Sequence, residues 1–343
     1  MSLLRSYRAT GADLPFGDPL SAHTGVAMEG YFWRITDAEG RVIIALCGVN
    51  QGPEGPWATV GLAAWPTGFL RTAALEGAWA DPHGLGVEGG SGEFEANRRH
   101  LRVNLGEDSQ LNLRFDDPLP WQHGAVGGSS IFQMVPALNQ YWHPWLLVGK
   151  ASGTAIVGGE TWEFTDAQVY AEKNWGREGF PESWWWGQAQ GFTETDACVA
   201  FAGGLVHSGK LRTEVTGLVV RLPGGRVFRL GNPVVSPVDT HTNDELWQLS
   251  GRGYGWKVEI TATAPLDHAF VLPVPLPSEH RNIAGDLEHL AGELSITVHR
   301  FGRHVWSGKT TSAALEHGGL DRAAAELQRR GLDPGLSSAP PVL

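Results

Sequence analysis

Short apolar segments separated by glycines and prolines recur along the chain, and this punctuation restricts the fold more than any other feature. The sequence has 46 Gly and 21 Pro among 343 residues, about a fifth of all positions, and both residues favour turns and interrupt helices. The segments Gly30–Asp37 and Arg41–Val49 are rich in β-branched and aromatic residues and flank the short connection Ala38–Gly40, as in a hairpin. The pattern therefore favours many short strands over long helices.

The strand-like segments fall into two groups, about twenty segments in all, and they predict an all-β protein. A sheet with so many strands needs its edges closed or covered. We therefore expect two β-barrel or sandwich-like halves, one at residues 1–150 and the other at residues 151–319.

One helix signal stands out, near the end of the chain. The segment Leu320–Arg330 (LDRAAAELQRR) has Asp321 as a candidate N-cap and Gly331 as a stop. We expect residues 320–343 to form this short helix followed by a frayed tail.

Composition indicates a packed globular protein, because 42% of the residues are hydrophobic and 18% are charged. The net charge is −11 and there is no basic stripe, so we expect no nucleic-acid partner. The 13 histidines show no HxH, HExxH or CxxC spacing, which predicts no metal site. We also expect no cofactor. The oligomeric state does not follow from the sequence.

The cysteines and the N-terminus indicate a compartment. Cys47 and Cys198 lie far apart in apolar runs, which favours two buried thiols over a disulfide. The N-terminus lacks the apolar core of a signal peptide, and no run approaches the roughly 18 apolar residues of a membrane helix. We expect a cytoplasmic protein, and a peripheral contact with a membrane is left open.

The most informative segment for function is Ala171–Phe192, AEKNWGREGFPESWWWGQAQGF. It places the carboxylate of Glu172 close in sequence to four tryptophans, Trp175, Trp184, Trp185 and Trp186. Aromatic faces stabilise cations, and a dry pocket protects a carbocation from water. The segment therefore suits acid chemistry that generates a cation, although an ordinary aromatic core with a hydrogen-bonded acid is an open alternative.

Strand alternation divides the side chains of this region between two faces. From Trp162 to Asn174 one face carries Tyr170 and Glu172, while Lys173 points to the other. In the next segment Trp184, Trp186 and Gln188 share a face. We expect the aromatic, amide-bearing face to point into a barrel and contact a ligand. Burial there would raise the pKa of Glu172 and keep it protonated as a proton donor.

A second aromatic cluster is the run NQYWHPW. Pro144 makes a regular central strand improbable there. Tyr141, Trp142, His143 and Trp145 are candidates for the mouth of a cavity. His143 is also a candidate base, with a hydrogen-bonded loop histidine as the alternative.

Several motifs occur in a fixed order between about residues 20 and 319. They are Gly30–Trp33 (GYFW), Pro120-Trp121, Trp142-His143, Phe164–Trp175 (FTDAQVYAEKNW), Gly176, Phe180-Pro181, the W-x-W-x-Q of Trp184, Trp186 and Gln188, Gly292–Leu294 and Thr311–Gly319. Together they closely resemble the tocopherol cyclase family. The central EKNWG, FP and WxWxQ motifs are specific, and the flanking motifs alone are weak.

The resemblance implies a lipocalin-like, two-domain β fold. It also implies an enzyme that cyclises a prenylated hydroquinone to a chromanol. Tyr170-Ala171-Glu172 also resembles an aromatic-x-carboxylate element of the related carotenoid hydratases, which supports an acid site there. The sequence departs from the plant pattern because it lacks an organelle-targeting extension and adds Asp321–Leu343. These departures leave the substrate open.

The leading hypothesis is a cofactor-independent intramolecular lyase acting on a hydrophobic prenylated phenol or another isoprenoid. A hydratase, in which water traps the same cation, and a lipid carrier without chemistry are alternatives. The predicted catalytic residues are Glu172, Tyr170 and His143. The predicted substrate-binding residues are Lys173, Asn174, Trp175, Trp184, Trp186, Gln188, Tyr141, Trp142 and Trp33.

Overall fold

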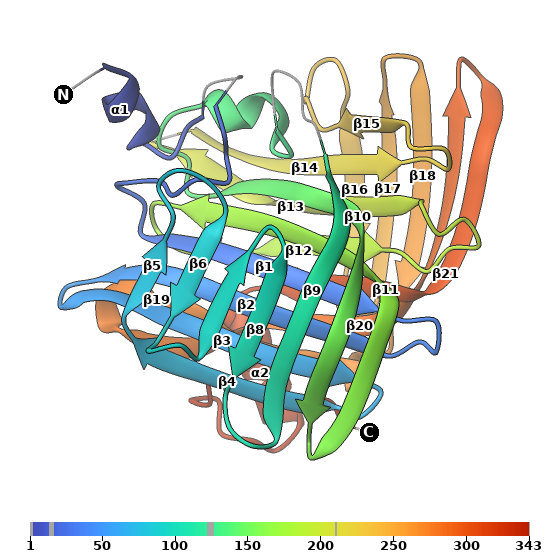
Figure 1. Ribbon diagram of the computed structural model, residues 1–343. Coiled ribbons are helices and arrows are strands. Elements are labelled where there is room, and N and C mark those ends of the chain that lie inside the picture. The colour runs from blue at the N-terminus through green and yellow to red at the C-terminus, as the bar shows by residue number, and fades with distance from the viewer. Residues whose placement is uncertain (1–2, 14–16, 122–126, 210, 343) are drawn as a thin grey trace.

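The computed structural model describes residues 3–13, 17–121, 127–209 and 211–342. Within these residues the chain forms 21 β-strands and two α-helices, which confirms the predicted all-β class (Figure 1). The strands belong to two antiparallel sheets. Short 3-10 helices occur at η1 (Ser130–Met134), η2 (Leu266–His268) and η3 (Pro277–Glu279), and α1 (Leu3–Arg8) lies near the N-terminus.

The first sheet contains 11 strands. They are β1 (Met28–Thr36), β2 (Val42–Gly52), β3 (Gly55–Trp65), β4 (Phe69–Glu76), β5 (Ala78–Ala80), β6 (Gly86–Gly89), β7 (Phe94–Asn97), β8 (His100–Asn104), β9 (Ser109–Pro120), β10 (Tyr141–Val157) and β11 (Glu160–Gly176). Their order is β4-β3-β2-β1-β11-β10-β9-β8-β7-β6-β5. The two edge strands are joined by Gly77, whose φ is +80°, so the sheet curls until its ends adjoin.

The second sheet contains 10 strands. They are β12 (Trp184–Ala189), β13 (Cys198–Ser208), β14 (Leu211–Arg221), β15 (Val227–Leu230), β16 (Val238–Thr242), β17 (Leu246–Gly253), β18 (Trp256–Thr263), β19 (Phe270–Leu276), β20 (Arg281–Arg300) and β21 (Arg303–Gly318). Their order is β15-β14-β13-β12-β21-β20-β18-β17-β16, with β19 paired to β20. The chain passes between the sheets after Gly176 and reaches the second sheet at Trp184. The predicted division at residue 150 falls within β10 and stays a prediction.

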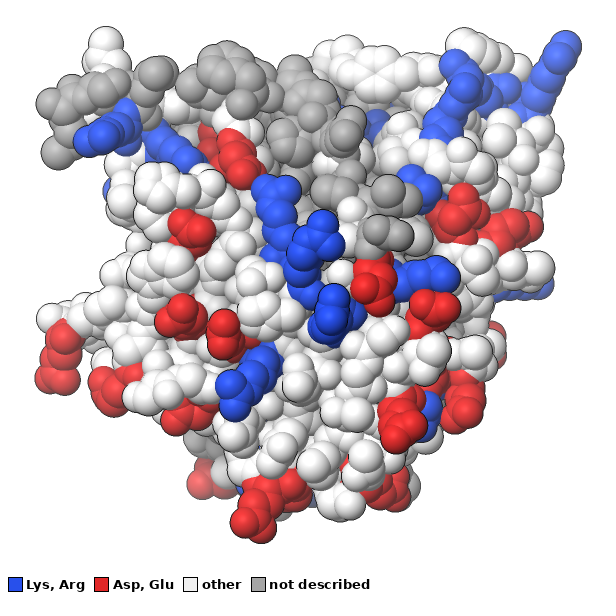
Figure 2. Space-filling view, viewed as in Figure 1, with Lys and Arg blue, Asp and Glu red and all other residues white. Residues whose placement is uncertain are grey.

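Each sheet curls around its own hydrophobic core. Trp33 and Ile35 of β1 point into the core of the first sheet, and Phe201 and Trp247 belong to the core of the second. The outward positions of several strands are polar, as in β8, whose burial alternates. Figure 2 shows acidic and basic side chains mixed over the face of the molecule seen in Figure 1. Among the described residues, no helix has the length and apolarity that a membrane span requires.

The predicted alternation along β11 is interrupted at Asp166. This residue has a φ of +53°, and the pairing with β10 shifts between Ala151 and Gly153. The bulge reverses the faces, so Phe164 points into the first core while Tyr170 belongs to a cluster between the sheets. The prediction that Trp162 and Phe164 share a face with Glu172 is therefore wrong. The predicted alternation holds for the residues after Asp166.

The second sheet packs against the outer face of the first, where Arg34 bridges the layers. Arg34 is fully buried. Its Nη1 donates to Gln188 Oε1 at 2.9 Å, and its Nη2 donates to the carbonyls of Leu290 at 3.1 Å and Ser312 at 2.8 Å. These acceptors lie on β12, β20 and β21, so one side chain of the first sheet joins three strands of the second.

The C-terminal helix is α2 (Leu320–Arg329), as predicted. Its N-cap is Gly319 rather than the predicted Asp321, which lies in the first turn, where a negative charge favours the helix dipole. The prediction of a frayed tail is wrong: Ala339 is buried and exchanges two backbone hydrogen bonds with Val271. Leu343 lies outside the described residues. The predicted buried free thiols, Cys47 and Cys198, are confirmed.

Arg34→Ala is expected to lower the free energy of unfolding by about 3–5 kcal/mol, because it leaves three buried acceptors without a charged donor. Urea unfolding followed by fluorescence measures this change. The control is Arg71→Ala, which removes an exposed ion pair with Asp108 and should cost about 0–1 kcal/mol. Equal, small losses in both variants would contradict a bridging role for Arg34.

Candidate active site

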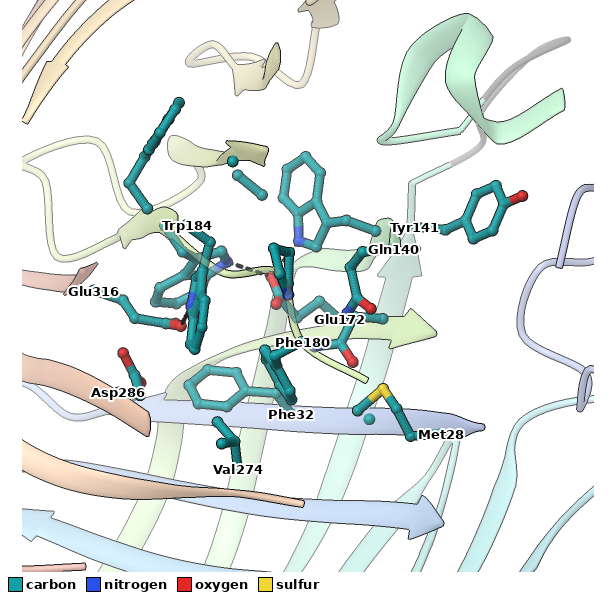
Figure 3. Close-up of a pocket in the computed structure, with 18 of the residues that line it drawn as sticks. Met28, Phe32, Gln140, Tyr141, Glu172, Phe180, Trp184, Val274, Asp286 and Glu316 are labelled. Atoms are coloured by element: carbon teal, nitrogen blue, oxygen red, sulfur yellow. Dashed lines mark hydrogen bonds between the residues drawn. The ribbon is translucent and has the colours of Figure 1, made fainter. Parts of the chain in front are cut away.

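A cavity of about 180 Å³ lies between the two sheets. Its wall combines residues of the first sheet, such as Phe32 and Glu172, with residues of the second, such as Trp186 and Glu316. Phe180, in the connection between the sheets, also lines it (Figure 3). The prediction that the aromatic face points into a barrel is therefore corrected. That face points between the layers, while both barrel interiors are filled by hydrophobic cores.

Glu172 is a buried carboxyl held by three donors. The indole Nε1 atoms of Trp142 and Trp186 donate to its Oε2, each at 2.8 Å. The hydroxyl of Tyr170 donates to the same oxygen at 2.5 Å. All three hydrogen bonds from described residues therefore converge on one oxygen of the carboxyl.

The electrostatics of Glu172 favour its protonated form. Burial raises the pKa of Glu172 to about 7, although the three hydrogen bonds oppose this shift. Burial also raises the pKa of Tyr170 well above its usual range, and the neighbouring Glu172 charge adds to this effect. Tyr170 is therefore a neutral donor, and Glu172 exchanges its proton near neutral pH.

Two glycines allow side chains to approach the cavity closely. A Cβ on Gly30 would lie 2.3 Å from Asn174 Oδ1, and a Cβ on Gly318 would lie 1.9 Å from the ring of Trp184. Any side chain at either position would clash. Gly30 pairs with Asn174 across β1 and β11, and Gly318 pairs with Trp184 across β21 and β12. The glycines thus let Asn174 and Trp184 lie flat along the cavity wall.

Many of the predicted site residues lie together. Tyr170 contacts Glu172 directly. The predicted residues that line the cavity are Glu172, Asn174, Trp184, Trp186, Tyr141 and Trp142.

Lys173 lies on the opposite face of β11 from Glu172, so its predicted contact with substrate is corrected. Its ammonium is fully buried and lies 3.2 Å from Glu29 Oε1. It also donates to the carbonyls of Pro19 at 3.2 Å and Ser21 at 3.0 Å. Although burial opposes the shift, Lys173 and His23 lower the pKa of Glu29 to about 2. Lys173 therefore anchors the N-terminal segment against the first sheet.

Trp175 and His143 also lie outside the cavity lining that the described residues form. Trp175 stacks on His23 with ring centroids 4.4 Å apart. His143 pairs with Lys173 across β10 and β11, which puts it on the face away from Glu172, and it stacks on Trp121. His143 is therefore not placed to act as the base. The strand also continues through Pro144, contrary to prediction, with a register shift after it.

Trp33 and Gln188 were also predicted to bind substrate, but neither belongs to the cavity lining that the described residues form. Trp33 belongs to the core of the first sheet, one residue out of phase with the cavity-lining Phe32. Gln188 is on the predicted face of β12, but its amide oxygen accepts the hydrogen bond from Arg34. It therefore supports the contact between the sheets.

Sequence reasoning missed three carboxyls of the second sheet that line the cavity: Asp286, Glu288 and Glu316. The first two lie two residues apart in β20, so they share a face, and Glu288 pairs with Glu316 across β20 and β21. The signal was an acid pair at i and i+2 within the apolar run IAGDLEHLAG. Phe180 and Pro181, quoted above only as a motif, also line the cavity.

The arrangement can deliver a proton to an apolar molecule. A protonated carboxyl that lines a mainly apolar, aromatic cavity can donate its proton to a bound substrate. The indole faces can then stabilise a developing cation. The carboxylate oxygens of Asp286, Glu288 and Glu316 lie within 4.8 Å of one another, a spacing that one divalent cation could bridge. The absence of a metal stays a prediction.

Three solved structures share this architecture. An AttH protein from Nitrosomonas europaea has a TM-score of 0.51 and 15% identity, and the match covers 90% of this chain and 98% of that one. Kievitone hydratase from Nectria haematococca has a TM-score of 0.54 and 13% identity, with 86% of this chain and 89% of that one covered. CghA with Sch210972 has a TM-score of 0.55 and 13% identity, with 90% of this chain and 96% of that one covered. At these identities the similarity establishes the fold, which is all-β and lipocalin-like.

Sequence comparison identifies the family. Two plant proteins are similar: the probable chloroplastic tocopherol cyclase of Oryza sativa subsp. japonica, 32% identical over 131 residues, and the chloroplastic tocopherol cyclase of Zea mays, 30% identical over 197 residues. The matches cover 37% and 54% of this chain but only 28% and 40% of those proteins. The profile of the tocopherol cyclase-like family matches residues 122–319. The chain therefore belongs to the tocopherol cyclase-like family.

Proposed function

We propose that this protein protonates a double bond of a prenylated hydroquinone and closes a chromanol ring. The observation that carries the proposal is Glu172, a buried acid in a cavity between the sheets, with three donors on a single oxygen. The two curated plant relatives are named as tocopherol cyclases, which supports the choice of substrate class.

The hydrogen bonds around Glu172 decide where its proton resides. An indole N–H can only donate, so Trp142 and Trp186 require Oε2 to remain an acceptor. The acidic proton is therefore carried by Oε1, and Glu172 lines the cavity. Once the proton has moved to the substrate, the same donors stabilise the carboxylate that remains. The site is thus arranged for the charge that develops during the reaction.

The aromatic wall serves the next step. Protonation of a trisubstituted double bond places the positive charge on the tertiary carbon. Phe32 and Trp186 line the cavity with ring centroids 5.3 Å apart in an edge-to-face arrangement, and Trp184 adds a further indole. Their faces shield the cation until the phenol oxygen attacks it. The product is an isomer of the substrate, so no external reactant is consumed.

A hydratase is the second candidate, and Asn174 favours it. The Oδ1 atom of Asn174 is buried and accepts no hydrogen bond from the described residues, and Asn174 lines the same cavity as Glu172. A water molecule held there could trap the cation before the phenol does. The amide oxygen of Gln188 accepts a hydrogen bond from Arg34, so Gln188 is not available for this role.

Incubation with 2,3-dimethyl-6-phytylhydroquinone in detergent and heavy water tests the reaction. We expect a product of substrate mass plus one deuterium at carbon, detected by mass spectrometry, because the proton added to the double bond comes from an acid that exchanges with solvent. A product heavier by one water would instead establish the hydratase. Unchanged ligand that co-purifies with the protein would support a carrier.

Glu172→Gln is expected to reduce turnover by about 10² to 10⁴-fold, because the variant lacks the general acid. The fold should persist, since an amide of the same size occupies the site. The control is Glu163→Gln, an exposed position on the same strand, which should retain full activity. Normal turnover by Glu172→Gln, measured as chromanol formed per enzyme, would exclude Glu172 as the proton donor.

The rate should fall as the pH rises above about 7, because only protonated Glu172 donates and its pKa is raised to about 7. The described carboxyls that interact with it are Glu288 and Glu316. Tyr170→Phe removes a hydrogen bond that favours the carboxylate, so the alkaline limb of the kcat/KM profile should move to higher pH. An alkaline limb that stays in place, or moves to lower pH, would contradict this assignment.

A further inference from the structure

Two buried carboxyls and one partly buried carboxyl face the cavity from the second sheet; we call Asp286, Glu288 and Glu316 the acid cluster. Asp286 and Glu288 come from β20 and Glu316 from β21. Their oxygens all lie within 4.8 Å of one another. Burial and the neighbouring negative charges of Glu316 and Glu288 raise the pKa of Asp286 well above its usual range, so Asp286 holds a proton. The cluster therefore holds protons as well as charge.

The acid cluster has unused hydrogen-bonding capacity. Asp286 is 6% exposed and Glu288 is 1% exposed. Their Oδ1 and Oε1 atoms, respectively, are buried and have no hydrogen-bond partner among the described residues. A buried polar atom without a partner is costly unless a ligand or water completes it. Because both residues line the cavity, a bound molecule can supply what is missing.

Charge balance limits the ionisation of the cluster. The positive charge of Arg34 is close enough to lower the pKa of Glu288, although burial and the charge of Glu316 raise that pKa overall. One negative charge in the cluster is matched by this buried guanidinium, whereas a second would be uncompensated. Two of the three carboxyls therefore carry protons, and the cluster as a whole can accept one more.

Two tryptophans on one face of β12, two residues apart in sequence, each donate a hydrogen bond to one of the two acid sites of the cavity. Trp186 Nε1 donates to Glu172, and Trp184 Nε1 donates to Glu316 Oε1. Figure 3 shows Glu316 and Asp286 together on one side of Trp184, with Glu172 on the other. A molecule in the cavity thus meets a carboxyl on each side of the indole wall.

We propose that the acid cluster is a second catalytic site, in which Glu316 binds the phenolic hydroxyl of the substrate and accepts its proton as the ring closes. This inference rests on the proposed function and names the base of that reaction. Glu316 is the least buried of the three, so it is the member that the hydroxyl reaches, while Asp286 and Glu288 carry the two protons that the cluster already holds.

The step balances in atoms and charge. Glu172 gives its proton to the alkene, so one C–H bond forms and the carbon–carbon double bond is lost. The phenol oxygen bonds to the tertiary carbon as its O–H bond breaks and the proton passes to Glu316. The cluster then holds three protons and Glu172 holds none. The protein returns to its starting state when solvent restores a proton to Glu172 and removes one from the cluster.

Binding tests the cluster without turnover. We compare 2,3-dimethyl-6-phytylhydroquinone with its dimethyl ether under argon, using the quenching of tryptophan fluorescence. A hydrogen bond to a charged acceptor is worth about 1.5–3 kcal/mol, so the hydroquinone should bind at least about 10-fold more tightly. Glu316→Gln should abolish this preference. Glu172→Gln and Glu293→Gln, an exposed position on β20, should keep it.

Equal affinities for the two ligands in the unmodified protein, or an unchanged preference in Glu316→Gln, would overturn the proposal. If Glu316→Gln does not fold, Glu316→Asp withdraws the carboxylate from the cavity by one methylene group, and a reduced preference is expected. A stoichiometric Mn²⁺ site that electron paramagnetic resonance detects, and that Glu316→Gln removes, would also overturn it, because the carboxyls would then bind a cation.

Turnover in heavy water separates this inference from the proposed function. With the base removed, Glu316→Gln should still protonate the alkene reversibly, so recovered substrate gains deuterium while ring closure falls about 10²-fold. Glu172→Gln should show neither. Ring closure by Glu316→Gln at the normal rate would exclude Glu316 as the base. Absence of deuterium and product with the unmodified protein would refute the cyclase activity, and the binding comparison would still decide the role of the cluster.

Discussion

The cavity lies between two sheets with separate cores, and the buried side chain of Arg34 supplies a polar contact that joins the sheets beside their apolar clusters. Its guanidinium is buried in the outer face of the first sheet and reaches acceptors on three strands of the second. Hydrogen bonds are directional, so they fix the position of one sheet on the other more strictly than apolar packing alone. The distance between Glu172 on β11 and the acid cluster on β20 and β21 depends on this alignment.

Two adjacent buried residues of β11, Glu172 and Lys173, differ in whether a partner of opposite charge compensates their burial. Lys173 and Glu29 form an ion pair between the first sheet and the N-terminal segment, so both remain charged in the interior. Glu172, the next residue along β11, has donors but no cation that pairs with it among the described residues, and its pKa is raised instead. Because side chains alternate along the strand, the charged Lys173 and the buried Glu172 point to opposite faces although they are adjacent in sequence.

The sequence predicted the strands and the central acid because both depend on local patterns. Alternation within β11 and β12 brought Tyr170, Glu172 and Trp186 to one face, and the structure agrees. It could not tell whether that face points into a barrel or onto another sheet, because either environment is apolar. The bulge at Asp166 was not predicted, because nothing in the local sequence indicates a residue with a left-handed backbone conformation there. The acid cluster depends on the pairing of Glu288 with Glu316, which no local pattern reveals.

The position of the cavity has a consequence for how such proteins diversify. Most of each hydrophobic core lies inside its own curled sheet, whereas most of the cavity wall lies on the faces between the sheets. Substitutions in the wall therefore leave most of the packing that stabilises the chain untouched. New ligand shapes can be accommodated by changing residues such as Phe32, Val274 or Phe180 at little cost to folding, so one scaffold can acquire different ligands while Glu172 stays in place.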